Sequence, residues 1–114
     1  VVIYRNVGGF MGGAAMFNVT LQSDSKAVGD IAHDTYVVLE VKPGEHLITA
    51  KGPGSESNLP LTLGQDAVEF VQVDMSAGNT PVLKSRLAAE AKGELVQDNL
   101  QLGFRRSLVA SAAP

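Results

Sequence analysis

Residues 35–50 constrain the fold more than any other part of the chain, because they form the pattern of a strand, a Pro-Gly turn and a second strand. Apolar residues recur at every second position on both sides of the turn, as half-buried strands require. Pro43 fixes its own φ, and Gly44 tolerates the positive φ of a tight reversal. We therefore predict an antiparallel hairpin that turns at Pro43 and Gly44.

Strand patterns of this kind recur along most of the chain and are separated by turns rich in Gly, Pro, Ser and Asp. Short strands at even spacing are typical of antiparallel hairpins packed as a sandwich. We predict an all-β (mainly β) fold, a small antiparallel β-sandwich with one short C-terminal helix. The expected strands are residues 1–5, 14–21, 28–31, 35–41, 46–51, 59–63, 68–75 and 81–88. The expected inward residues are Phe17, Val19, Leu21, Val37, Leu39, Val41, Leu59, Leu61, Leu63, Val71, Val73 and Met75.

The pattern changes after Ala88, where helix-forming residues surround a single Gly93. This composition predicts a short helix at residues 92–101. The residues from 107 to 114 have no pattern that would fold alone, so we expect this tail to dock on its own domain or on a neighbour. We assign residues 1–88 to the β-sandwich domain and residues 89–114 to a short helix and docking tail.

Composition excludes several classes of function. A chain of 114 residues with a net charge of -3 and few aromatic residues has no basic, ring-rich face for nucleic acid. The absence of cysteine excludes disulfides, thiol nucleophiles and cysteine-ligated metals. The longest apolar runs have the length of strands, so we expect no membrane-spanning helix. The first residue is Val1 and not Met, so we expect a processed or trimmed piece, with any signal peptide or lipid anchor upstream.

A resemblance to a known family rests on an ordered set of motifs within residues 1–87. These are Val28-Gly29-Asp30-Ile31, the strand led by Tyr36, Pro43-Gly44-Glu45-His46, and Leu61-Thr62-Leu63. The set resembles the bacterial domain-of-unknown-function family 2846, lipoprotein-like envelope domains that are similar in turn to PEGA-type surface β-domains. The resemblance implies export to the bacterial envelope and a structural or binding role. It implies no known catalysis.

The two histidines give no metal or catalytic site. His46 follows the Pro-Gly turn, where its ring can bond a backbone group and pin the hairpin, and His33 lies in an expected turn. A zinc site needs three or four protein ligands, and two histidines without cysteine do not supply them. We expect no metal and no cofactor.

Other catalytic patterns are also missing. No Gly-x-Ser-x-Gly elbow is present, and the carboxylates are spread along strands and turns as on a solvated surface. The glycine-rich residues 8–13 lack the spacing of a phosphate loop and lead into another strand. We expect a protein that is not an enzyme.

Two apolar segments are candidates for contact with a partner. Phe10 and Met11 are flanked by glycines that allow close approach, which is the more functional alternative to a plain flexible connection. In the tail, Arg105 and Arg106 can set register while Phe104, Leu108 and Val109 supply buried area. We expect both segments to contact other chains, and we expect the domain to stay folded when residues 103–114 are deleted.

These patterns predict a non-enzymatic structural or interaction module of the bacterial cell envelope, in the periplasm or at the outer membrane. Its expected partners are other envelope proteins in a homo- or hetero-oligomeric assembly, with no nucleic acid and with a membrane only through an upstream lipid anchor. The alternative is a β-domain of an envelope lipoprotein that binds a small glycan or lipid. An open apolar pocket between the sheets would favour that alternative.

Overall fold

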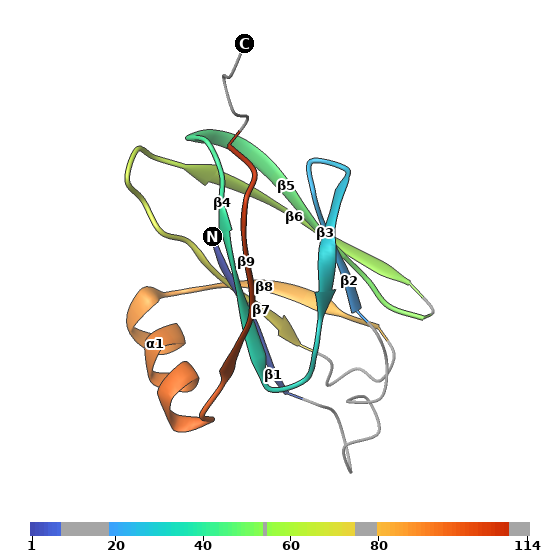
Figure 1. Ribbon diagram of the computed structural model, residues 1–114, viewed down its shortest axis with the longest axis vertical. Coiled ribbons are helices and arrows are strands. Elements are labelled where there is room, and N and C mark those ends of the chain that lie inside the picture. Colours follow the sequence, from blue (N-terminus) through green and yellow to red (C-terminus); the bar gives the residue numbers. More distant parts are fainter. Residues whose placement is uncertain (8–18, 54, 75–79, 110–114) are drawn as a thin grey trace.

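The computed structural model describes residues 1–7, 19–53, 55–74 and 80–109, and two β-sheets make up most of the molecule (Figure 1). The expectation of a mainly β fold with one short helix is confirmed. The elements are β1 (Val2–Val7), β2 (Val19–Ser23), β3 (Lys26–Ile31), β4 (Thr35–Glu40), β5 (Gly44–Lys51), β6 (Glu56–Leu63), β7 (Phe70–Asp74), β8 (Val82–Arg86), α1 (Ala88–Gln97) and β9 (Gln101–Ser107). Among the residues listed above as described, no helix has the length and apolar character needed to cross a membrane.

The two sheets differ in the direction of their strands. One has four strands in the order β3-β2-β5-β6, all paired antiparallel. The other has five strands in the order β8-β7-β1-β4-β9, in which β1 pairs parallel with β7 and β4 pairs parallel with β9. The even strand spacing predicts a sandwich of antiparallel hairpins alone. The two parallel pairs show that this part of the prediction is wrong.

The core lies between the sheets and contains most of the residues that were expected inside, together with buried residues that were not among them: Val1, Ile3, Val28, Ile31, Ile48, Ala50 and Leu83. Each fully buried aliphatic side chain there contributes about 1.5 to 3 kcal/mol. Val41 and Leu59 are partly buried and pack against this core, while Phe17 and Met75 lie outside the described residues. The other expected inward residues are buried: Val19, Leu21, Val37, Leu39, Leu61, Leu63, Val71 and Val73.

The predicted hairpin at Pro43 and Gly44 is wrong, although both of its strands exist. Strand β4 pairs with β1 and β9, whereas β5 pairs with β2 and β6 in the other sheet. The alternation in residues 35–50 fits either arrangement, because strands of opposite sheets also turn alternate residues toward a shared core. Residues 41–43 thus carry the chain from one sheet to the start of β5 in the other. We call residues 41–46, this connection and the first residues of β5, the crossover.

The helix lies about one turn earlier than predicted and covers the outer face of the five-stranded sheet. Its Ala91 is buried in a small cluster with Tyr4, Phe70 and Leu100. Asn99 ends the helix in the left-handed region at φ 52°, and the amides of Asn99 and Leu100 donate to the carbonyls of Val96 and Leu95, each at 3.1 Å. This Schellman motif directs the chain into β9.

The described part of the tail docks on its own domain. Residues 101–107 form β9, which pairs with β4 from Thr35 to Glu40, and the amide of Leu108 donates to the carbonyl of Glu40 at 2.7 Å. Phe104 and Leu108 pack against the main core. Only Phe104 is shielded from solvent along β9, so an edge strand of this kind has no alternating pattern to detect.

Side chains link the two sheets along both open sides of the sandwich. On one side, the Arg106 guanidinium donates to the carbonyl of Val28 at 3.0 Å, and the Phe104 ring lies over Gly29. On the other side, the amide of Leu83 donates to the hydroxyl of Ser57 at 3.2 Å. The edge strands β9 and β8 are therefore tied to the opposite sheet without a continuous ladder of backbone hydrogen bonds.

Candidate functional site

Three hollows border the crossover at one end of the sandwich. The valine hollow, about 460 Å³, is lined by Val1, Val2, Val38, Leu39, Glu40, Val41, Pro43, Leu63, Gly64, Gln65, Asp66, Ala67 and Val68. The tail hollow, about 400 Å³, is lined by Ser23, Asp24, Lys26, Val41, Lys42, His46, Ser107, Leu108 and Val109. The β6 hollow, about 380 Å³, is lined by Asp24, Glu45, His46, Leu47, Pro60, Leu61 and Thr62. Each hollow thus includes at least one residue of the crossover.

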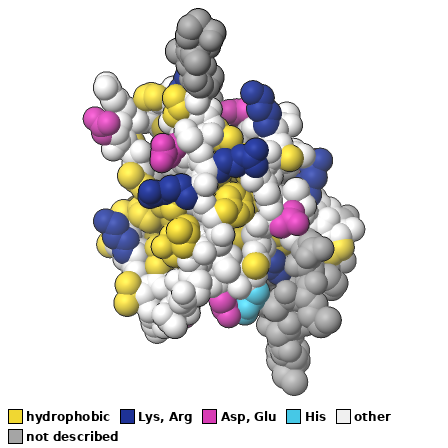
Figure 2. All heavy atoms as spheres, in the orientation of Figure 1, with side chains coloured by type: hydrophobic (Ala, Val, Ile, Leu, Met, Phe, Trp, Pro, Cys, Tyr) yellow, Lys and Arg dark blue, Asp and Glu magenta, His cyan; other side chains and the backbone are white. Residues whose placement is uncertain are grey.

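Exposed apolar side chains accompany these hollows. Val68 in the valine hollow is 59% exposed, Val109 in the tail hollow 45%, and Leu47 in the β6 hollow 38%. Figure 2 shows apolar side chains gathered over β4 and β9, with Lys and Arg side chains beside them. Large apolar groups at the surface mark contact sites when they lie together around a concave region.

A tight turn brings Asp24 to this end of the sandwich. Asp24 and Ser25 join β2 to β3 and have φ values of 51° and 69°, the two positive values of a type I′ hairpin turn. The Asp24 amide donates to the Leu47 carbonyl at 2.8 Å, and the Leu47 amide donates to Oδ1 of Asp24 at 2.8 Å. The turn is therefore fixed to the start of β5, directly beside the crossover.

His46 connects this turn to the crossover. Its Nδ1 lies 2.6 Å from Oδ2 of Asp24, its Nε2 lies 2.5 Å from the carbonyl oxygen of Lys42, and the side chain is only 12% exposed. Both partners are hydrogen-bond acceptors, so both ring nitrogens must carry a proton for both bonds to form. We call this arrangement the Asp24–His46 clamp. The ring bonds a backbone carbonyl, as predicted, but it holds a crossing between sheets and not a hairpin.

The clamp makes stability depend on pH. The hydrogen bond to Asp24 raises the pKa of His46, and the hydrogen bond from His46 lowers the pKa of Asp24. The contribution of His46 to the free energy of unfolding is complete below its ordinary pKa of about 6.5 and is lost as the pH rises through its raised pKa. The contribution of Asp24 is complete above its ordinary pKa of about 3.9 and is lost as the pH falls through its lowered pKa. We expect the difference in free energy of unfolding between the wild type and Asp24→Asn, measured in urea, to shrink from pH 6 to pH 9. A difference that stays constant over this range would contradict the assignment.

This geometry gives His46 a structural role. A general base needs a ring nitrogen with a free lone pair, and both nitrogens of His46 are bonded. His33 instead lies 3.0 Å from Asp34 in the turn before β4, where Asp34 has a positive φ. Among the residues that the structure describes, no group of three or more His, Cys, Asp and Glu side chains could hold a metal ion.

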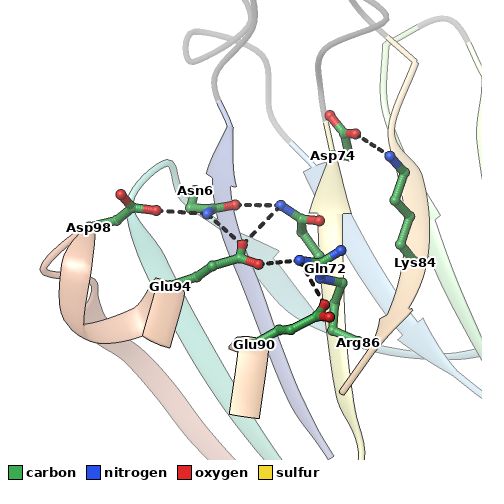
Figure 3. Close-up of polar contacts among 8 residues, drawn as sticks. All are labelled: Asn6, Gln72, Asp74, Lys84, Arg86, Glu90, Glu94 and Asp98. Atoms are coloured by element: carbon green, nitrogen blue, oxygen red, sulfur yellow. Dashed lines mark hydrogen bonds and ion pairs between the residues drawn. The ribbon is translucent and has the colours of Figure 1, made fainter. Parts of the chain in front are cut away.

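A second polar cluster lies under helix α1 and ties it to the sheet (Figure 3). Oε2 of Glu94 accepts from the side-chain amide nitrogen Nδ2 of Asn6 at 3.0 Å and from Nε2 of Gln72 at 3.4 Å. Oε1 of Glu94 accepts from the guanidinium of Arg86. Nδ2 of Asn6 also donates to Oδ2 of Asp98 at 2.8 Å. Beneath the cluster, burial raises the pKa of Tyr4. Sequence reasoning missed this cluster, because only the helical spacing of Arg86, Glu90 and Glu94 is visible along the chain.

The structure places the remaining predicted site residues as follows. Leu108 and Val109 line the tail hollow, Arg105 is exposed on β9, and Phe104 and Arg106 are used in contacts with β3. Phe10 and Met11 lie outside the described residues. Of the predicted contact residues, Leu108 and Val109 therefore join Pro43 and His46 at the crossover end.

Gly44 allows a test of the crossover backbone. Its φ of 126° is rarely adopted by other residues, and a Cβ built on it would meet no atom within 4 Å. We expect Gly44→Val to lower the free energy of unfolding by about 1 to 3 kcal/mol, all of it backbone strain. An unchanged midpoint of thermal unfolding would show that the crossover does not need this conformation.

Comparison of the chain with protein-family models, with curated proteins and with solved structures found no match. The resemblance to the envelope family therefore stays a prediction from the motifs in the sequence.

Proposed function

We propose that this protein is a non-enzymatic structural or interaction module of the bacterial cell envelope, and that it contacts its partners in a larger assembly through the crossover end. One observation carries the proposal of a contact surface there. Three hollows meet at the crossover, and each is bordered by an exposed apolar side chain. Apolar anchors around concave surfaces are the usual centres of protein interfaces.

The rigidity of the crossover end also supports a binding role. The β2–β3 turn is held to β5 by bonds from both the backbone and the side chain of Asp24, and His46 holds the crossover. A surface that is already ordered loses little conformational entropy when a partner binds. The assignment to the envelope is supported by the motif resemblance alone.

Photo-cross-linking tests this proposal. A photoreactive amino acid is placed at position 68 or at position 109. The matched control is position 96 on α1, where Val96 is 81% exposed and lines none of the three hollows. We expect adducts with envelope proteins from positions 68 and 109 in cells that make the full-length protein. Adducts from position 96 alone, or a protein found only in the cytoplasmic fraction, would overturn the proposal.

A second candidate function is the binding of a small apolar ligand such as a lipid. The valine hollow favours it, because the walls are mostly valine, leucine, alanine and proline and the volume of about 460 Å³ is in the range of ligand pockets. Native mass spectrometry of the purified protein after incubation with envelope lipids tests this function. Bound lipid that is lost in an Ala67→Trp variant would support it, and an unchanged mass of the wild-type protein would contradict it.

A further inference from the structure

The proton on His46 is required by the geometry of the clamp. A neutral imidazole has one N–H, so it can donate to Asp24 or to the carbonyl of Lys42 but not to both. If the proton stays on Nε2, the lone pair of Nδ1 faces a carboxylate oxygen at 2.6 Å; if it stays on Nδ1, the lone pair of Nε2 faces a carbonyl oxygen at 2.5 Å. Both arrangements are repulsive at these distances, so loss of a proton must open one of the two contacts.

The charged groups around the ring favour the proton on balance. Asp24 faces the ring from the β2–β3 turn. Glu45 of β5 shares the β6 hollow with His46, and Lys26 of β3 and Lys42 of the crossover share the tail hollow with it. The amino group of Val1 weakly opposes the charge on the ring. Two other segments line these hollows, residues 60–62 of β6 and residues 107–109 at and after the end of β9, and neither contributes a titratable side chain. The Asp24 carboxylate, at hydrogen-bond distance, is therefore the dominant neighbour.

We propose that His46 is a proton-operated clamp that holds both the Lys42 carbonyl of the crossover and the β2–β3 turn when it is protonated, and that lets one of these two contacts open when it is neutral. His46 lies in the wall of both the tail hollow and the β6 hollow, Lys42 lines the tail hollow, and Pro43 lines the valine hollow. Opening of either contact therefore alters the tail hollow and the β6 hollow, whose walls both contain His46. Opening of the Lys42 contact also alters the backbone next to Pro43, in the wall of the valine hollow. This inference concerns the shape of the surface and holds whatever the surface binds.

Nuclear magnetic resonance on the wild-type chain from pH 5 to pH 9, without ligand, tests the clamp. The probes are the ring signals of His46 and the backbone amide signals of Gly44 and Leu47. We expect the His46 ring to titrate with a midpoint above the ordinary value of about 6.5, and we expect both amide signals to move with the same midpoint. A ring midpoint at or below that value, or amide signals that do not move with the ring, would overturn the proposal.

Variants assign the effect to the clamp. Asp24→Asn should lower the His46 midpoint, and His46→Gln should abolish the shared transition of the Gly44 and Leu47 amides. His33→Gln is the matched control, because His33 also pairs with an aspartate but lies away from the crossover; it should leave the transition unchanged. A transition that survives His46→Gln or disappears in His33→Gln would refute the clamp. If His46→Gln fails to fold, the wild-type titration and Asp24→Asn still decide.

Discussion

Gly29→Ala is expected to lower the free energy of unfolding by about 2 to 5 kcal/mol, a large loss for the addition of one methyl group. Gly29 has a φ of 140°, which other residues rarely adopt, and a Cβ built on it would lie 2.9 Å from the Cζ atom of Phe104. The free-energy cost of the strained backbone and the cost of displacing the Phe104 ring therefore add together. Because Phe104 belongs to β9 and Gly29 to β3, the change also weakens the link between the two sheets.

Urea unfolding measures the effect, and Gly93→Ala is the matched control. Gly93 lies in α1 with open space around it, so alanine there should stabilise by about 0.5 to 1 kcal/mol. In a Phe104→Ala background the cost of Gly29→Ala should fall to the backbone part alone, about 1 to 2 kcal/mol. Equal costs in both backgrounds would show that the ring of Phe104 does not pack on Gly29.

Deletion of residues 103–114 is expected to remove about 4 to 8 kcal/mol, which is comparable with the entire stability of a small domain. The deletion takes away most of β9, leaves the edge of β4 unpaired, and removes Phe104 and Leu108 from the core. The lack of pattern in this tail had led us to expect a truncated domain that stays folded. The structure gives the opposite expectation, because the described part of the tail pairs within its own sheet.

Circular dichroism and thermal unfolding of the truncated chain test this expectation, with Arg105→Ala as the control. Arg105 is exposed on β9, so its replacement should change stability by no more than about 0.5 kcal/mol. A truncated chain that melts cooperatively near the temperature of the full chain would show that β9 contributes little to the domain.

The sequence was sufficient to predict about half of the buried core residues and the approximate place of most strands. Alternation at Val37 and Leu39, and again at Val71 and Val73, directly reflects one buried face for each strand. The positive φ of Gly44 was likewise predictable from its place after Pro43. These features depend on neighbours along the chain, so local patterns contain them.

The pairing of strands was not predictable in the same way. Residues 35–50 have the same alternation whether β4 and β5 form a hairpin or cross between sheets, and β9 has only Phe104 to mark an inner face. The end of α1 was the exception, because Asn99 is a common left-handed residue after a helix and could have placed that end correctly.

The candidate site was predictable only in part. Pro43, Gly44 and His46 were expected to form a structural turn, with the His46 ring bonded to a backbone group, and the ring does bond the carbonyl of Lys42. Among the expected contact residues, Leu108 and Val109 lie at the crossover end. The role of Asp24 was not expected, because a carboxylate in a distant turn reaches His46 only through the pairing of β2 with β5. The hollows themselves arise from the meeting of the crossover, the β2–β3 turn and the end of β9, and no local pattern describes such a meeting.

The central claim is that the crossover end is the contact surface of an interaction module. Co-purification of partner proteins with variants that carry a charged substitution tests this claim most directly. Val68→Asp and Val109→Asp change exposed side chains at two of the hollows, and Val96→Asp makes the same change at an exposed position of α1 that lines none of the three hollows. Each variant, in the full-length protein, is recovered from solubilised envelopes, and the co-purifying proteins are quantified by mass spectrometry. We predict that the proteins retained by the wild type are lost with Val68→Asp and Val109→Asp and kept with Val96→Asp. Retention of the same proteins by all three variants would contradict the account.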